Sequence, residues 1–222
     1  MKKTLLTLLV LVFASVFASA QTYQELGKFY NWGISLEGNM NFKDNTSDRL
    51  TPKNTPTFSV GYFYEFNAQN HWSFLVGLDF NYYKIFDFEN LANKSFSEKS
   101  HYFSVPLLLQ YKTKVANNVF LAAKAGLYID LDRSDKGLIT NTDVAGNIIN
   151  IQYEPDYCNY SFLFSVGAMF DFNYFLLGTD ILFSYYPSDA KTSIWYQDGY
   201  IDKYAMNGNY LGARLSFKLK KF

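Results

Sequence analysis

Apolar and polar residues alternate strictly in eight segments of the chain, and this pattern predicts eight β-strands that each have two different faces. In the first segment, for example, Ile34 and Leu36 alternate with Ser35 and Glu37. The predicted strands cover about 29–40, 57–67, 72–84, 101–112, 119–131, 160–171, 174–186 and 209–219. The fourth has the weakest pattern, because Pro106 lacks the N–H group that a strand ladder uses.

The two faces differ in charge. One face carries large apolar residues and no charge on any predicted strand, whereas the other carries small residues together with all the charges: Glu37, Glu65, Asp79, Lys124, Asp130, Asp171, Asp180, Arg214 and Lys218. A Lys or Arg on a lipid-facing surface costs about 2–4 kcal/mol at the membrane midplane. We therefore predict an all-β fold, an eight-stranded antiparallel up-and-down transmembrane β-barrel with the charges inside. The alternative, a soluble ligand-carrying barrel with a mixed interior, would expose a continuous apolar band to water.

The connections alternate in length. Those at about 41–56, 86–99, 132–158 and 187–206 are long, and those at 68–71, 113–118 and 172–173 are short. Outer-membrane barrels have short periplasmic turns and long outer loops, so an even strand number predicts that both termini are periplasmic.

Aromatic residues make up 20% of the chain and gather at the ends of the predicted strands. We expect them to form two interfacial girdles. At the short-turn end these are Phe29, Tyr30, Trp32, Tyr64, Phe66, Trp72, Tyr111, Phe120, Phe172, Tyr174 and Phe175. At the opposite end they are Phe42, Phe58, Tyr82, Phe86, Tyr102, Tyr157, Tyr160, Tyr185 and Tyr186.

The N-terminus has the three parts of a secretory signal peptide: Lys2 and Lys3, an apolar stretch over 5–17, and the cleavage site Ala18-Ser19-Ala20. We expect residues 1–20 to be removed and 21–222 to form one barrel domain. The alternative, an N-terminal membrane anchor, needs a stretch of about 20 apolar residues, and the stretch over 5–17 is shorter than that. No Cys follows the cleavage site, so no lipoprotein anchor is expected.

Composition narrows the possible partners and the possible kinds of membrane passage. The net charge of +0 gives no reason to expect a nucleic-acid partner. The single cysteine, Cys158, excludes an internal disulfide and carries no recognisable role. Mean hydropathy is -0.12 and no apolar run beyond residue 20 reaches helix-spanning length, so any membrane passage would be made by strands of a closed barrel.

Three segments resemble the porin-like outer-membrane β-barrel domain family of Gram-negative bacteria. HYFSVPLLLQYKT at 101–113 is similar to that family's Y-x-x-(I/V)-P-L-L-L-x-Y segment, and VFLAAKAGLYID at 119–130 resembles the strand that follows it. The terminal GARLSFKLKKF ends in Phe222, like the C-terminal strand that barrel-assembly machinery reads, although Lys221 is atypical there. The resemblance implies integral residence in the bacterial outer membrane, with membrane lipid and the assembly machinery as partners. It leaves the role open, since one relative works in a protein-secretion system.

The first candidate site is the barrel interior. Eight strands leave a lumen that side chains can fill. Several inward positions are bulky, namely Phe63, Leu75, Leu108, Tyr128, Leu163, Met169 and Leu182. We therefore predict a largely plugged lumen containing an ion-pair network, while a narrow ion path stays open as an alternative. The predicted lumen cluster is Glu37, Glu65, Asp79, Lys124, Asp130, Asp180, Arg214 and Lys218. In it, Arg214 is expected to be the central cation, between Glu37 and Asp180.

The long loops are the second candidate site. Alternating residues at 139–142 and 148–151, on either side of 145–147, predict a hairpin that extends the fifth and sixth strands. The last long loop carries Trp195, Tyr196, Tyr200 and Tyr204, which suit a contact surface. Packing within the loop or against lipid headgroups explains these aromatics equally well.

Catalysis has little support in the sequence. Of the two histidines, His71 falls in a short turn, and His101 lies beside Ser100 and Ser104 without a recognised motif. We expect no enzyme, no catalytic residue, no cofactor and no metal site. A structural or interaction barrel is the preferred reading, with a transport or secretion component and a lipid-modifying enzyme as alternatives. The sequence does not name an external or secretion partner.

Overall fold

The computed structural model describes Tyr23 and residues 25–41, 50–52, 55–90, 95–131, 137–142, 148–153, 160–187, 190–196, 201–206 and 209–221. The predicted signal peptide lies outside this part of the chain. So do Phe42, Tyr157, Cys158, Tyr200 and Phe222, and the hairpin turn at 145–147.

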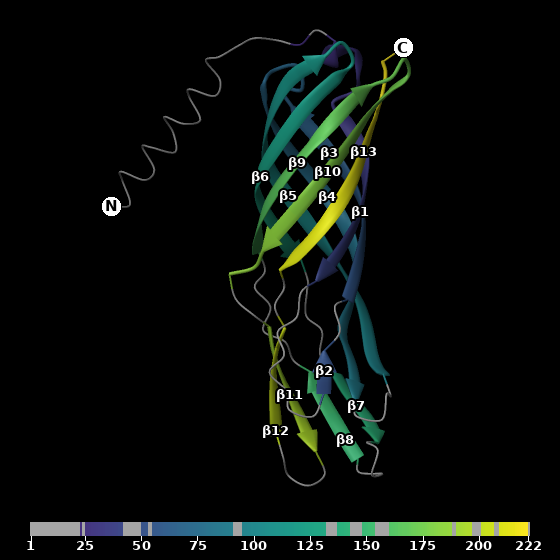
Figure 1. Cartoon of the computed structure of the whole chain (residues 1–222), viewed down its shortest axis with the longest axis vertical. Coiled ribbons are helices and arrows are strands. Elements are labelled where there is room, and N and C mark those ends of the chain that lie inside the picture. Colours follow the sequence, from purple (N-terminus) through teal and green to yellow (C-terminus); the bar gives the residue numbers. More distant parts are fainter. Residues whose placement is uncertain are drawn as a thin grey trace, which may run out of the picture.

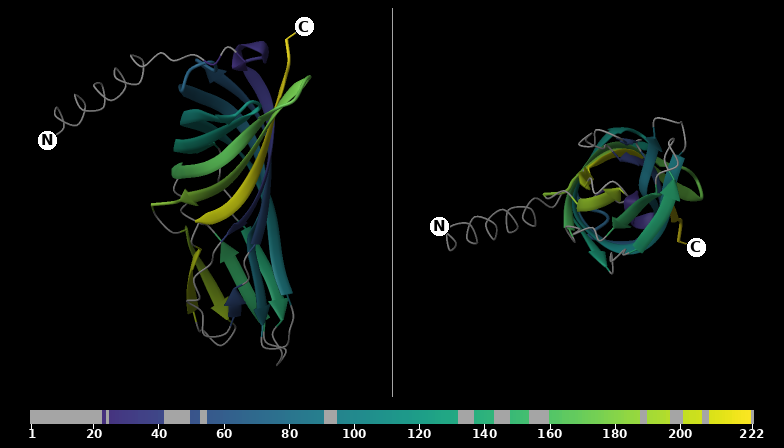
Figure 2. Two further views of the ribbon diagram at one scale, coloured as in Figure 1. Left: turned by 45° about the horizontal axis from the view of Figure 1, so that its top comes forward. Right: turned by 90° about the horizontal axis from the view of Figure 1, so that it is seen from below.

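Eight antiparallel strands close into a barrel (Figure 1). They are β1 (Trp32–Asn41), β3 (Thr55–Phe66), β4 (Trp72–Asn90), β5 (Ser95–Ala116), β6 (Val119–Leu131), β9 (Tyr160–Asp171), β10 (Phe175–Tyr185) and β13 (Tyr210–Leu219). Around the barrel the order is β4-β3-β1-β13-β10-β9-β6-β5, and pairing of β4 with β5 completes the ring, which Figure 2 shows end-on. The predicted fold class is confirmed. No helix in the described part of the chain is long and apolar enough to cross a membrane.

The strand bounds differ from the prediction at both ends of the barrel. At the turn end, β5 runs on to Ala116 in pairing with β6. β1 begins at Trp32, because Leu26–Lys28 form a short 3-10 helix, η1, at the barrel mouth. β4 and β5 are longer than predicted, because they continue to pair with each other beyond a register shift between Lys84 and Phe86.

Pro106 lies inside β5 and does not end it. It is the register partner of Tyr128 on β6. On the other side, pairing with β4 stops at Val76↔Leu107 and resumes at Asp79↔Ser104. The missing N–H of proline accounts for this gap in the ladder.

Side chains alternate between the interior and the outer surface as the sequence pattern predicts. On β1, Leu36 is 53% exposed and Glu37 is 6% exposed. The described outward positions of all eight barrel strands lack Asp, Glu, Lys and Arg. The barrel is therefore inverted relative to a soluble protein, with its charges inside and an apolar surface outside.

Four further strands form a second sheet beyond the loop end of the barrel (Figure 1). They are β7 (Gly137–Thr142), β8 (Ile148–Tyr153), β11 (Ala190–Tyr196) and β12 (Ile201–Met206), in the order β12-β11-β8-β7. We call them the loop sheet. β7 and β8 confirm the predicted hairpin, but the hairpin pairs with β11 and is not part of the barrel sheet. A short strand, β2 (Leu50–Pro52), pairs with the extension of β4.

Four aromatic residues assigned to the girdles lie inside the barrel instead. Phe29 and Phe120 are 1% and 0% exposed, and Tyr102 and Tyr186 are also buried. Tyr102, Phe120 and Tyr186 stand at even positions of the same parity as Ser104, Ala122 and Ser184, which point inward. Phe29 turns inward because η1 bends the chain across the barrel mouth. Position near a strand end therefore does not by itself place a ring in the girdle.

Candidate functional site: the charged interior of the barrel

Nine charged side chains from seven strands meet in the interior, each no more than 8% exposed. The eight predicted members of the lumen cluster all lie there, together with Lys112, which the sequence analysis missed. Lys112 is 0% exposed and has the same parity as Gln110, so the pattern already contained the signal. Lys112 is the last residue of the predicted strand 101–112, but the inward face of that strand was assigned only as far as Gln110. Asp171, at the turn end of β9, is only half-buried.

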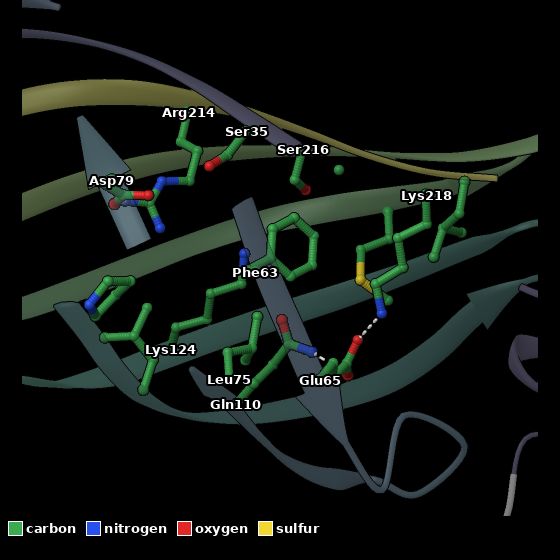
Figure 3. Close-up of a pocket in the computed structure, with 15 residues that line it drawn as sticks. Ser35, Phe63, Glu65, Leu75, Asp79, Gln110, Lys124, Arg214, Ser216 and Lys218 are labelled. Atoms are coloured by element: carbon green, nitrogen blue, oxygen red, sulfur yellow. Dashed lines mark hydrogen bonds and ion pairs between the residues drawn. The ribbon is translucent and has the colours of Figure 1, made fainter. Parts of the chain in front are cut away.

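Glu65 on β3 joins two lysines near the turn end. Lys112 Nζ lies 2.5 Å from Glu65 Oε1, and Lys218 Nζ pairs with Glu65 Oε2. Gln110 Nε2 donates to Glu65 Oε1 at 2.8 Å, and Lys112 also donates to the Ala68 carbonyl at 2.5 Å. One carboxylate thus serves two buried ammonium groups. Figure 3 shows Glu65 between Gln110 and Lys218.

Arg214 on β13 forms a second cluster at mid-barrel. Its Nε donates to Glu37 Oε2 at 2.7 Å, and its Nη2 lies 3.3 Å from Asp79 Oδ2 on β4. Asn39 Nδ2 donates to Glu37 at 2.6 Å, and Tyr128 OH donates to Asp79 at 2.8 Å. The Glu37 contact agrees with the closure of β1 on β13, where the two residues are register partners. Arg214 is therefore a cation between two carboxylates.

The second carboxylate beside Arg214 is Asp79 and not the predicted Asp180. Asp180 is the register partner of Arg214 on β10, but its side chain pairs with Lys124 on β6, with Nζ and Oδ2 2.5 Å apart. The expectation that Asp180 flanks Arg214 as an ion partner is corrected accordingly. In a narrow lumen, side chains from opposite walls meet, and Lys124 is long enough to reach Asp180 across the intervening β9.

Toward the loop end, the interior is closed by tyrosines and aliphatic side chains. Tyr186 OH donates to Asp130 Oδ2 at 2.9 Å. The surrounding buried cluster is Phe63, Leu75, Leu108, Tyr128, Leu163, Leu182, Tyr186 and Tyr210. Leu108, Leu163 and Leu182 are at most 1% exposed, so apolar packing and polar bonds occupy the same cross-section.

The turn end is covered by the described N-terminal segment, which we call the terminal plug (Tyr23 and residues 25–29). Leu26 and Phe29 pack in one buried cluster with Phe120, Met169 and Leu176 from the barrel wall. Polar contacts fix the plug at its edge. Tyr23 OH lies 3.0 Å from His71 Nδ1.

A salt bridge also holds the plug to the wall. Lys114 Nζ lies 2.7 Å from Glu25 Oε1. This hydrogen bond lowers the pKa of the Glu25 carboxyl from its usual range. Both side chains are about one-third exposed, so solvent weakens the pair.

A small cavity lies among these side chains. A cavity of about 30 Å³ is lined by residues including Phe63, Glu65, Arg214 and Lys218, as Figure 3 shows. Such a volume holds on the order of one or two water molecules. The part of the chain that the structure describes contains no cluster of His, Cys, Asp and Glu suited to a metal ion.

The other candidate residues from the sequence lie in the loop sheet and on β5. Trp195 and Tyr196 belong to β11 and Tyr204 to β12, so three of the four aromatics of the predicted contact surface lie in the loop sheet. His101 is exposed on the outer face, where its ring lies 5.7 Å from that of Phe80, whereas Ser104 is buried inside. The two residues therefore stand on opposite faces of β5.

A closed antiparallel barrel with an uncharged apolar exterior and a charged interior defines an integral β-barrel protein of the outer membrane. The family model of the outer membrane protein beta-barrel domain matches residues 19–189. The chain belongs to this family and is an outer-membrane protein, as the resemblance of its fourth, fifth and last barrel strands implied. None of the curated proteins compared with the sequence matches it.

Solved structures share the fold at low identity. The outer membrane protein OprG from Pseudomonas aeruginosa is 12% identical over 87% of this chain and 97% of its own, with a TM-score of 0.52. Neisserial surface protein A is 10% identical over 87% and 99% of the two chains, with a TM-score of 0.46. The N-terminal β-barrel domain of Pseudomonas aeruginosa OprF is 11% identical over 87% and 99%, with a TM-score of 0.34. The likeness to OprG is one of fold alone.

Proposed function

We propose that this protein is a non-enzymatic, non-conducting outer-membrane barrel that presents its loop sheet to a partner outside the cell. The packed interior is the observation that carries the proposal. Ion pairs, the aliphatic residues Leu108, Leu163 and Leu182, and the terminal plug pack the described interior, and the cavity among the lumen charges has a volume of about 30 Å³. A hydrated ion or small solute needs a continuous water-filled path through the barrel, and an isolated cavity of this volume does not provide one.

The proposed orientation has both termini in the periplasm. The described chain ends meet at the end of the barrel that carries the short turns, where Phe29 pairs with Lys220. The loop sheet stands at the other end. Short turns toward the periplasm and long segments outside the cell are the usual arrangement of such barrels.

The loop sheet supports a contact role. Strand pairing gives it an ordered backbone: β8 pairs with β7 on one side and with β11 on the other. Trp195 and Tyr196 on β11 are residue types that often dominate binding energy in protein interfaces. A rigid scaffold carrying aromatic residues costs little conformational entropy when it binds.

Single-channel recording tests the non-conducting interior. The purified protein, reconstituted in a planar bilayer, should show no steady conductance at symmetric salt. A variant with the smaller plug residues Leu26→Ala and Phe29→Ala should also stay closed, because Leu108, Leu163 and Leu182 remain in place. Large, stable, ohmic openings in the wild type would place the protein among the porins.

A second experiment tests the contact role. Whole cells are treated with a membrane-impermeant crosslinker, and the partners of the wild type are compared with those of a variant in which Trp195 and Tyr196 are replaced by Ser. Loss of an external partner in the variant supports the proposal. Recovery of periplasmic secretion components by both proteins would favour secretion machinery instead, and altered lipid chemistry in a deletion strain would favour an enzyme.

A further inference from the structure

The outer surface of the barrel is hollowed on one side. Two adjoining depressions of about 660 and 590 Å³ lie over β5, β6, β9, β10 and β13 and share Tyr111, Ala123, Val166 and Ile181. We call them together the lateral hollow. The surface that they expose is mostly apolar, and it faces the hydrocarbon of the membrane because positions such as Ala123, Val166 and Ile181 point outward.

Aliphatic side chains, two of them alanines, form the middle of the hollow. Strand register places Ala123, Val166, Ile181 and Ala213 side by side in one row across β6, β9, β10 and β13. Elsewhere on the outer surface aromatic rings occupy outward positions, for example Phe58 and Tyr62 on β3. A concave apolar surface gives an acyl chain more contacts than a flat wall does, because dispersion attraction depends on the number of close atom pairs.

Three lysines gather at the turn end of the same wall. Backbone pairing of residues 28–30 with 219–221 places Lys28 opposite Lys221, and Lys220 opposite Phe29 at the rim of the barrel. Lys220 Nζ donates to the Asn173 carbonyl at 3.0 Å, and Lys221 Nζ donates to the Gly27 carbonyl at 3.1 Å. An ammonium group has three N–H donors, so each retains capacity for a further acceptor.

The neighbourhood of the lysines suits a headgroup region. Asp171 is the carboxylate that interacts with Lys28 and Lys220, and it offsets one of the three positive charges. Tyr174 and Phe172, on the adjacent turn, are 75% and 45% exposed. Aromatic rings of this kind sit at the level of lipid headgroups.

The distance between the lysines and the hollow fits one lipid molecule. Leu215, which lines the hollow, lies five residues before Lys220 on the same chain segment. At about 3.4 Å per residue this is about 17 Å along the strand, or about 13 Å of depth for a strand tilted by about 40°. That depth is nearly half of the hydrocarbon core, which is about 30 Å thick.

We propose that the lateral hollow and these three lysines together bind an anionic phospholipid. Its acyl chain lies in the hollow, and its phosphate accepts hydrogen bonds from Lys28, Lys220 and Lys221. The orientation proposed above places this end of the barrel in the inner leaflet, where phospholipid is the available lipid. The site does not depend on what the loop sheet contacts.

Native mass spectrometry of the purified mature protein tests the site. The probes are phosphatidylglycerol and phosphatidylethanolamine with identical acyl chains, added in equal amounts in detergent. The wild type should retain phosphatidylglycerol preferentially. A lysine near an anionic headgroup contributes about fivefold in affinity, so Lys220→Gln with Lys221→Gln should lower the retention of phosphatidylglycerol by about 25-fold and that of phosphatidylethanolamine much less.

Two substitutions test the hollow. Ala213→Phe fills it and should lower the retention of both lipids, while Val60→Phe, an outward change on β3 away from the hollow, serves as the matched control and should not. Folding is checked by heat-modifiable gel mobility, and Ala123→Leu replaces Ala213→Phe if that variant does not fold. Equal retention of the two lipids by the wild type would overturn the proposal, as would equal retention by the hollow-filling and control variants. Displacement of phosphatidylglycerol by lipopolysaccharide at equal concentration would also overturn it.

Discussion

Replacement of Glu65 by Gln removes the only carboxylate that the structure pairs with Lys112 and Lys218. The amide keeps the size of the side chain but loses the charge. Lys112 then retains the Ala68 carbonyl, and Lys218 retains its position 5.6 Å from the ring centre of Phe63. Neither contact neutralises a buried ammonium group, so two cations are left close together in the interior.

The expected cost follows from what is left behind. Removing one partner of a buried ion pair costs about 3–5 kcal/mol, because the remaining charge stays buried without compensation. Glu65→Gln should lie in this range. Lys218→Met is different, since it leaves the neutral pair of Glu65 and Lys112 intact and keeps an unbranched apolar side chain against Phe63. It should cost about 1–3 kcal/mol, as for an ordinary destabilising substitution.

Reversible unfolding in urea from lipid vesicles measures both costs. Tryptophan fluorescence and gel mobility follow the transition, and linear extrapolation gives the free energy of unfolding. Ser73→Ala, a change to a neutral neighbour of Gln110, controls for loss of a single hydrogen bond. If Glu65→Gln unfolds within about 1 kcal/mol of the wild type, or if Lys218→Met costs more than Glu65→Gln, then Glu65 does not hold the two lysines as described.

Three further outcomes are expected. Arg214→Ala should lower the unfolding midpoint, and adding Glu37→Ala should cost less than the two single changes summed, as a double-mutant cycle measures. Leu78→Arg, which puts a charge on the lipid-facing surface, should reduce the folded fraction on gels by far more than the inward Ser165→Asn; equal effects would refute the assigned faces. Because the pKa of Glu25 is lowered in the folded protein, its contribution is present above the ordinary carboxyl pKa and is lost as pH falls through the lowered value. The protection factors of amides in the terminal plug, which compare their exchange with the intrinsic rate at the same pH, should therefore fall in acid, and Glu25→Gln should remove that dependence.

The sequence predicted the barrel well because one physical constraint acts at every strand position. Lipid excludes charge, so the parity of a residue such as Glu37 or Leu36 follows from its neighbours two positions away. The same rule would have found Lys112 and would have placed Phe120 inside. Lys112 was missed and Phe120 was placed in the girdle because strand ends and apolar runs were given more weight than the alternation of inward and outward positions.

Ion partners could not be predicted in the same way. Register places Asp180 beside Arg214, yet Asp180 pairs with Lys124 from another strand. Inside a narrow barrel the partner depends on side-chain length and on the stagger of the whole ring, neither of which is a local property. Phe29 illustrates the same limit, because its burial depends on η1 and on three residues far along the chain.

The terminal plug also constrains the order of assembly. Its residues are made before the rest of the barrel, but their partners Phe120, Met169 and Leu176 come from later strands, and Lys220 follows the last one. The pairing of Phe29 with Lys220 is therefore complete once the final strand lies beside β1. Contacts between the two ends of a chain carry a large loop-closure cost and form late in folding. Docking of Phe29 thus marks the completed barrel, and an unprotected N-terminal segment identifies a chain whose ring is still open.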